Sequence, residues 1–162
     1  MFRATEGRWG SREVEITDVT LVGGDGRPGH VFEAGAPLEV RLTIHAATPT
    51  RDFVFGLGIF TADAVLVYGT NTGLEDLQPE ELAGDGEVRI LIDRLDLVEG
   101  TYKVDVAVHT LDGFAYDYHR LLHSFRVTSS TKDVGIYRPA HKWTFSPAIR
   151  FKASRQPASQ GQ

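Results

Sequence analysis

The sequence predicts an all-β protein that folds as a single antiparallel β-sandwich. Short apolar runs alternate with polar residues at a period of two, which is typical of strands that bury one face. Gly- and Asp-rich turns separate these runs, and no stretch shows the alternation of strands with helices that builds a parallel sheet. A chain of 162 residues has the length of one domain and can bury about two-thirds of the surface of its unfolded form.

At least seven strands are expected. In chain order they cover residues 14–21, 38–44, 53–60, 65–70, 88–92, 102–108 and 124–127. The clearest is 38–44, in which four aliphatic residues alternate with Glu39, Arg41 and Thr43. The same periodicity places ten side chains in the core, namely Leu38, Val40, Leu42, Ile44, Val88, Ile90, Ile92, Tyr102, Val104 and Val106.

The segments between the strands carry turn chemistry. Gly and Asp cluster at residues 23–29 and 82–87, where tight turns need a positive φ. Only residues 74–82 can form a helical turn or two, and Pro79 limits that turn. Gly100 and Tyr102 open a strongly alternating strand, as at the corner of many immunoglobulin-like sandwiches. Tyr102 is therefore interpreted as a structural residue that fills the end of the core.

Composition excludes several classes of protein. Seventeen Lys and Arg against twenty-two Asp and Glu give a net charge of −5, so nucleic acid is not an expected partner. The absence of cysteine excludes disulfides, thiolate zinc sites and cysteine nucleophiles, and it fits a reducing compartment. No apolar run approaches the roughly 20 residues that cross a bilayer, and the N-terminus lacks a secretory segment. We therefore expect an intracellular protein without direct membrane insertion.

The sequence lacks the motifs of several common catalytic sites. It contains no P-loop and no Gly-x-Ser-x-Gly elbow, and nothing distinguishes two of the twenty-two acids as a glycosidase pair. His119 and His123 have the spacing of zinc ligands on a helix, but their segment reads as strand or loop. On a strand the two side chains would stand about 13 Å apart, too far for one metal ion. Neither catalytic residues, a metal site nor a cofactor is predicted.

The remaining signal is a set of aromatic and polar residues outside the core pattern. Sugar recognition needs a flat aromatic ring against the CH groups of a pyranose, with acids, amides or imidazoles for the hydroxyls. The predicted carbohydrate-binding residues are Trp9, Asp105, His109, Tyr116, Asp117, Tyr118 and His119. We expect them on a shallow sheet face, and the face that carries Gly56 and Gly58 is the next choice. For each aromatic residue, a place in the core is the competing interpretation.

Ten short motifs, taken in order, resemble one known family. They are RWG at 8–10, VEITDV at 14–19, FEAGAPL at 32–38, FVFGLGI at 53–59, YGTNT at 68–72, LVEGTY at 97–102, YH at 118–119, FRV at 125–127, GIY at 135–137 and HKW at 141–143. The chain resembles the carbohydrate-binding C-terminal domain of the ATP-binding subunit of ABC transporters that export O-antigen and related polysaccharides (the Wzt type). The likeness covers residues 8 to 145, and Gly-Thr-Asn-Thr and Leu-x-x-Gly-x-Tyr are its most specific elements. Asn71 and its neighbours are interpreted as structural, bonding the backbone of a turn.

The resemblance implies an immunoglobulin-like, jelly-roll-like sandwich that binds a polysaccharide, especially its modified terminus, and has no enzyme activity. It also implies a cytoplasmic location at the inner-membrane face, and nucleotide-binding and transmembrane transporter subunits as partners. Any ATPase activity would lie in a separate nucleotide-binding domain. The expected organisation is a linker or N-terminal extension over residues 1–8, a carbohydrate-binding sandwich over 9–145, and a flexible tail over 146–162.

A homodimer is also expected. Ile136, Tyr137, Trp143 and Phe145 follow the last core strand and need a surface to cover them, and exchange of terminal segments is a common route to dimers. Two other functions stay open at this point: a small sandwich-fold hydrolase or lyase that acts on polysaccharides, and a purely structural assembly domain. Turnover of a polysaccharide would support the first, and a dimer without glycan binding would support the second.

Overall fold

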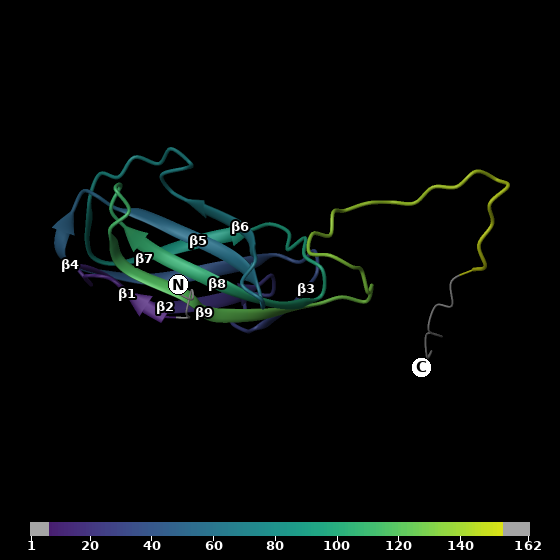
Figure 1. Cartoon of the computed structure of the whole chain (residues 1–162), viewed down its shortest axis with the longest axis horizontal. Coiled ribbons are helices and arrows are strands. Elements are labelled where there is room, and N and C mark those ends of the chain that lie inside the picture. Colours follow the sequence, from purple (N-terminus) through teal and green to yellow (C-terminus); the bar gives the residue numbers. More distant parts are fainter. Residues whose placement is uncertain (1–6, 154–162) are drawn as a thin grey trace.

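The computed structural model describes residues 7–153, and within them the chain forms nine strands in two sheets (Figure 1). The strands are β1 (Gly7–Trp9), β2 (Val14–Gly23), β3 (Val31–Glu33), β4 (Leu38–Thr50), β5 (Val54–Thr61), β6 (Leu66–Asn71), β7 (Leu82–Ile92), β8 (Gly100–His109) and β9 (Ala115–Thr128). One sheet has the order β1-β9-β8-β5-β6, with β3 added parallel to β9, and the other has the order β2-β4-β7. Every other pairing is antiparallel, which confirms the predicted sandwich.

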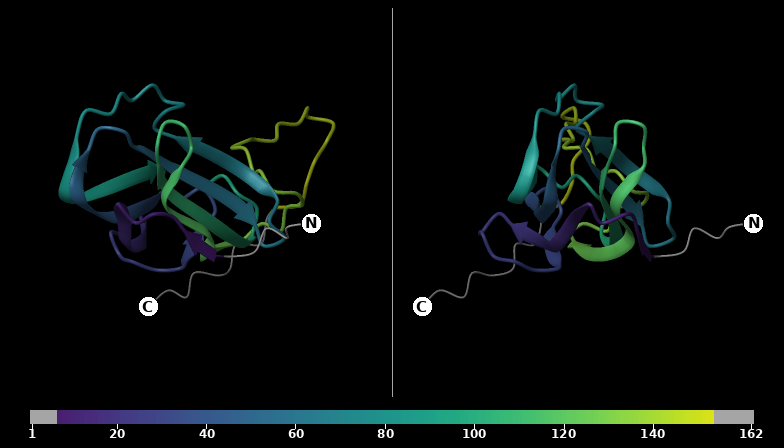
Figure 2. Two further views of the ribbon diagram at one scale, coloured as in Figure 1. Left: turned by 60° about the vertical axis from the view of Figure 1, so that its left-hand side comes forward. Right: turned by 90° about the vertical axis from the view of Figure 1, so that its left-hand side faces the viewer.

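The two sheets face each other across one apolar core. They approach where β2 contacts β9, and Figure 2 shows them separating towards β6 and β7. Most of the predicted core side chains are buried, with Leu38, Val104 and Val106 fully enclosed. Val88, Ile90 and Ile92 point inward as predicted but are only half-buried, because β7 is the edge strand of the smaller sheet.

Two local expectations about turns have different outcomes. Residues 74–82 contain no helix: the Oδ1 atom of Asn71 accepts the amide of Leu74, and Asp76 takes a φ of 62°, which interrupts a helical path. The structural interpretation of the Gly-Thr-Asn-Thr motif is confirmed by that bond, and by the bond from the amide of Phe55 to the Oγ1 atom of Thr72. The motif joins β6 to the neighbouring strand β5 and to the turn that follows.

Tyr102 is a structural residue, as predicted. Its ring is buried against Phe125, with centroids 5.6 Å apart, and its hydroxyl donates to the carbonyl of Val98 at 2.6 Å. Burial raises the pKa of this hydroxyl, so it stays protonated and remains a donor at neutral pH. The tyrosine therefore fixes the loop that leads into β8.

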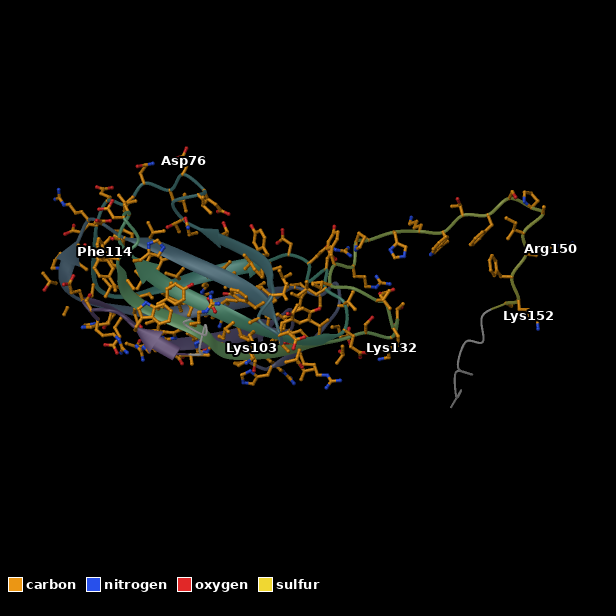
Figure 3. All side chains as sticks on the ribbon, viewed as in Figure 1. Asp76, Lys103, Phe114, Lys132, Arg150 and Lys152 are labelled. Carbon is orange, nitrogen blue, oxygen red and sulfur yellow. The ribbon has the colours of Figure 1, made fainter. Side chains whose placement is uncertain are left out.

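The segment after β9 first returns to the sandwich and then leaves it. The carbonyl of Ile136 accepts the amide of Val98, and the amide of Arg138 donates to Asp96. Residues 139–153 are then exposed throughout and extend away from the sheets, as Figure 3 shows at Arg150 and Lys152. Within residues 7–153 no helix has the length and apolar character to cross a membrane.

The predicted domain limits fall partly outside the described residues. Strand β1 begins at Gly7, two residues before the predicted start of the sandwich, and the last strand ends at Thr128. Residues 1–6 of the predicted extension and 154–162 of the predicted tail lie outside the described part. The limits at residues 9 and 145 stay predictions.

Candidate functional site

The outer face of the larger sheet carries a groove of about 410 Å³. Its floor consists of small residues on three adjacent strands: Gly56 and Gly58 on β5, Gly69 on β6 and Ala107 on β8. Gly69 is exposed and Gly56 is half-buried, so the sheet backbone is accessible to a bound molecule at these two residues, whereas Gly58 and Ala107 are buried. A Cβ atom at Gly58 would lie 3.0 Å from the ring of Phe60 and 3.4 Å from the Cβ of Asp105, so this glycine is required for close packing as well.

Two stacked aromatic rings stand beside this floor. Trp9 on β1 and Tyr118 on β9 are register partners, and their ring centroids lie 4.5 Å apart with an interplanar angle of 7°. Tyr118 lines the groove, whereas Trp9 extends the stack and remains 47% exposed. The pair presents a flat apolar surface to solvent next to the groove, which is the geometry that stacks against a sugar ring.

A buried carboxylate organises the polar wall of the groove. Asp105 on β8 is 3% exposed and accepts three hydrogen bonds: from the hydroxyl of Tyr118 at 3.1 Å, from Nη1 of Arg120 at 3.2 Å and from the amide of Leu121 at 2.7 Å. Arg120 also lies over the ring of Phe60, 5.0 Å from its centroid. Asp105 therefore positions its neighbours and has little surface of its own to offer a ligand.

Other groups around the groove retain hydrogen-bonding capacity. The Nδ1 atom of His109 donates to the carbonyl of Thr110 at 2.6 Å, so Nε2 of the neutral ring is an acceptor. The Oδ1 atom of Asn71 is used by the amide of Leu74, which leaves its amide nitrogen as a donor. Tyr118 donates its proton to Asp105, and burial together with that carboxylate raises its pKa, so its oxygen serves as an acceptor. Both donors and acceptors thus line the groove around its small-residue floor.

Strand β9 does not run regularly past β8. Val104 pairs with His123 and Val106 pairs with His119, so one β8 residue faces three residues of β9. Leu121, at the centre of this bulge, has a φ of 54°, which is unusual for a residue with a branched side chain. Its amide points at the carboxylate of Asp105. The bulge therefore brings the amide of Leu121 to the same carboxylate that holds Tyr118 and Arg120 at the groove.

The bulge overturns the expectation that His119 and His123 stand far apart. The Nδ1 atom of His119 lies 3.0 Å from the Nε2 atom of His123, and the two rings stack with centroids 5.3 Å apart. A spacing of about 13 Å holds only for a regular strand, and the left-handed conformation of Leu121 folds the intervening residues back. Among residues 7–153 no group of three or more potential metal ligands is close enough to hold an ion.

Asp117 lies in the interior, where it ties the two sheets together. It has no exposed surface, and it accepts a bidentate pair from Arg8 at 2.9 and 2.7 Å and the amide of Ile16 on β2 at 2.8 Å. Burial alone would raise the pKa of Asp117, but the bonds from Arg8 and Ile16 and the charges of His119 and Arg8 hold it below its ordinary value. Asp117 is therefore ionised at neutral pH and fully engaged.

Tyr116 and His119 also point into the sandwich. Tyr116 is the extra residue of a second bulge, and its hydroxyl donates to the carbonyl of Asp52 at 2.8 Å. His119 is 5% exposed, and its Nε2 atom lies 3.4 Å from Asp117. Of the predicted set, the structure brings Trp9, Asp105, His109 and Tyr118 together at the groove, and it places Tyr116, Asp117 and His119 behind the sheet.

Sequence reasoning missed Arg120 and Asn71. Arg120 shares the parity of Tyr118 along the strand, so the alternation that singled out the tyrosine also pointed to the arginine. Asn71 was assigned to its turn, and the structure gives it that role and a place on the groove wall. The Gly56 and Gly58 face, kept as the second choice, is the floor of the same groove.

Comparison with known proteins gives one consistent result. The family model described as the Wzt C-terminal domain matches residues 5–139. The O-antigen export system ATP-binding protein RfbB of Myxococcus xanthus is 28% identical over 140 residues, which are 86% of this chain and 31% of that protein, so the chain spans about a third of its relative. The crystal structure of the C-terminal domain of wzt superposes with a TM-score of 0.76 at 19% identity, covering 90% of this chain and 91% of that one. This structural likeness shows the shared fold.

Proposed function

The chain belongs to the Wzt C-terminal domain family, and from that premise we propose that it is a non-catalytic module that binds a bacterial surface polysaccharide for export. The ligand would be of O-antigen type, recognised at its modified end, in line with the O-antigen export role named for the Myxococcus xanthus relative. The observation that carries the proposal is the groove: a small-residue floor bordered by the stacked rings of Trp9 and Tyr118.

The chemistry of the groove suits a sugar. An exposed aromatic surface contributes about 0.5–1.5 kcal/mol per stacked ring beyond area burial. Arg120 and the amide of Asn71 supply donors, while His109 and Tyr118 supply acceptors, which match the mixed character of sugar hydroxyls. The groove is open along the sheet, so a polymer end can enter and leave. We expect micromolar or weaker affinity for one site, because these few contacts must also offset the cost of association.

The test is calorimetric titration with the O-polysaccharide released by mild acid from the lipopolysaccharide of the organism that carries this chain. Trp9→Ala should weaken binding about tenfold, since it removes the exposed half of the stack. Phe114→Ala is the matched control, because Phe114 is exposed, does not line the groove and lies outside the C-terminal segment. Equal affinity for wild type and folded Trp9→Ala would place the ligand elsewhere, and turnover of the polysaccharide would identify an enzyme instead.

We further propose that the chain forms a homodimer through its C-terminal segment. The rings of Trp143, Phe145 and Phe151 contact one another in this segment and are all at least 48% exposed. All twenty-two acids lie within residues 1–133 together with twelve Lys and Arg, whereas residues 134–162 hold five Lys and Arg and no acid. A basic, aromatic segment complements the acidic sandwich of a second copy. Two sites in one dimer would raise the affinity for a polymer through avidity.

Light scattering tests this arrangement. The full chain should have the mass of a dimer at tens of micromolar, and a chain that ends at residue 139 should have the mass of a monomer. A monomeric full chain would refute the dimer without affecting the proposed groove. As further partners we propose the nucleotide-binding and transmembrane subunits of an ABC transporter, which would place the domain in the cytoplasm at the inner membrane.

A further inference from the structure

The bulge of β9 is closed from both sides of the sheet. On the groove side, the carboxylate of Asp105 holds the amide of Leu121 and the side chains of Tyr118 and Arg120. On the opposite side, His119 and His123 stand at the two ends of the bulge and are joined ring to ring. The three residues between the histidines include Arg120, which lines the groove. The conformation of one wall of the groove therefore depends on both closures.

The contact between the rings requires one donor and one acceptor. If the Nε2 atom of His123 donates to Nδ1 of His119, then the proton of His119 lies on Nε2 and points towards Asp117 at 3.4 Å. This assignment of protons leaves each ring neutral, and the buried Nε2 atom of His119 is then close to Asp117 without a hydrogen bond to it. The bond exists while one, and only one, of the two facing nitrogens carries a proton, and it is lost when both carry one.

The charged groups around the pair come from four further parts of the chain. On β9 itself Asp117 faces His119, and from β1 and the loop behind it Arg8 and Arg12 act on the same ring. From β2 and the loop before β3, Asp18 and His30 act on His123. Two arginines and a third histidine oppose protonation of the pair, while two aspartates favour it.

We propose that His119 and His123 are positioning residues for the groove: the bond between their rings holds the bulge, and the bulge sets Tyr118 and Arg120. The left-handed backbone conformation of Leu121 costs about 1–3 kcal/mol, and the ring contact helps to offset that cost. Without the ring contact, the backbone of Leu121 relaxes. Relaxation at Leu121 withdraws its amide from Asp105, and the carboxylate then loses one of the three bonds that fix its orientation. Tyr118 shifts with it, and the stack with Trp9 is disturbed.

This arrangement makes the groove sensitive to acid. Burial is the main reason that the pKa of each histidine lies below its ordinary value of about 6.5, and for His123 the neighbouring His119 adds to the shift. The pair is therefore neutral at pH 7 and closed. As the pH falls, the pair takes up a first proton, and the two rings can still share one proton between their facing nitrogens. When the pair takes up a second proton, both facing nitrogens are donors and the bond between the rings is lost.

The stack of Trp9 on Tyr118 provides a readout that needs no glycan. In a Trp143→Phe background Trp9 is the only tryptophan, so tryptophan fluorescence and its quenching by acrylamide report its environment alone. His123→Leu removes the ring contact, whereas His123→Gln keeps a donor at that position and cannot titrate. His30→Gln is the control, since it removes a nearby histidine outside the pair.

We expect His123→Leu to lose most of the Trp9 signal at pH 7.5 and His123→Gln to retain it. The background protein should lose the same signal reversibly in acid, and His123→Gln should abolish that transition. If His123→Leu does not fold, the pH titration of the other two proteins decides the question. An unchanged Trp9 signal in folded His123→Leu, or an acid transition that persists in His123→Gln, would overturn the proposal.

Only the last step rests on the proposed function. If the groove binds the O-polysaccharide, His123→Leu should weaken binding about tenfold and His123→Gln by less than twofold. Loss of the Trp9 signal without any glycan binding in the wild type would leave the positioning role intact and refute the binding function. Glycan binding by the wild type together with an unchanged Trp9 signal in His123→Leu would support the binding function and refute the positioning role.

Discussion

Strand β9 has two faces that put similar residues to opposite uses. On the outer face, Tyr118 and Arg120 line an open groove and keep part of their hydrogen-bonding capacity available. On the inner face, Asp117 meets Arg8 and the amide of Ile16, so both its oxygens are occupied. Both sets are polar residues on one strand, one to three residues apart. What separates them is how many of their bonds the protein itself uses.

On a sandwich that is polar on many surfaces, a ligand can bind where polar side chains keep hydrogen-bonding capacity that the fold does not use. A buried polar group must be satisfied by the fold, because leaving it unpaired costs about 1–3 kcal/mol. A half-exposed polar group can lack a hydrogen-bond partner within the protein at little cost, because water forms that hydrogen bond until a ligand replaces it. Unused capacity next to a flat aromatic surface therefore marks the groove, and complete satisfaction marks Asp117 as structural.

The largest effect is expected from placing a charge on the inner face. Val104 on β8 has no exposed surface, so Val104→Asp buries an unpaired carboxylate, which costs several kcal/mol and should unfold the domain. Thr101→Asp on the same strand is the control, because Thr101 is exposed and such changes stay within about 0.5 kcal/mol. Thermal unfolding measures both. A Val104→Asp protein that melts like wild type would contradict the assignment of the two faces.

Next in size is the removal of Asp117. Asp117→Ala should lower the free energy of unfolding by about 2–3 kcal/mol, because the amide of Ile16 stays buried without a partner while half-exposed Arg8 regains water. Glu15→Ala removes the other, exposed partner of Arg8 and should cost less than about 1 kcal/mol. Urea unfolding with equal m-values gives both numbers. Equal losses from the two substitutions would mean that burial does not distinguish these ion pairs.

A smaller effect is expected on the outer face. Tyr118→Phe keeps the stack with Trp9 and removes the bond to Asp105, so it should cost about 1 kcal/mol of stability. Glycan affinity should fall as well, because the groove loses an acceptor. Tyr68→Phe is the control, since Tyr68 lies exposed on β6 and does not line the groove. A loss as large as that of Asp117→Ala would show that Tyr118 belongs with the structural set.

The smallest effect is expected from pH. His119 and His123 have pKa values below about 6.5 in the fold, so the unfolded chain takes up protons there before the folded chain does. The contribution of the two neutral histidines to stability is therefore complete above about pH 6.5, the pKa of histidine in the unfolded chain. It decreases as the pH falls from there towards the lower pKa values that the two histidines have in the folded protein. Thermal melts between pH 8 and 5.5 measure this, and replacing both histidines with Gln should flatten the curve. A rising stability in acid would reverse the sign of both shifts.

The alternation of apolar and polar residues was enough to predict the sandwich and most of its core. Leu38 to Ile44 and Tyr102 to Val106 bury the residues expected of them, because a half-buried strand needs that period. The three-residue strands β1 and β3 were not predicted, because they form only by pairing with β9, which lies about a hundred residues away in the sequence. So short a segment carries no period of its own.

The site was harder to predict for two physical reasons. Adjacent polar residues such as Asp117 and Tyr118 carry the same composition signal, and only their side of the sheet separates them. After Leu121, the bulge determines which side of the sheet each following residue of β9 faces. Leucine has no preference for a left-handed backbone, so the sequence does not predict the bulge. The contact of His119 with His123 follows from that one backbone conformation.

The pairing of β1 with β9 has a consequence for the order in which the protein assembles. The bond from Arg8 to Asp117 joins residues 109 apart, and Trp9 meets Tyr118 over the same distance along the chain. At 5–20 residues per second, a ribosome needs roughly 5–20 s to make the strand that β1 is waiting for. Closing so long a loop is also slow in a refolding chain. The aromatic wall of the groove is therefore among the last parts to form, and an unfinished chain has the small-residue floor without the stacked rings beside it.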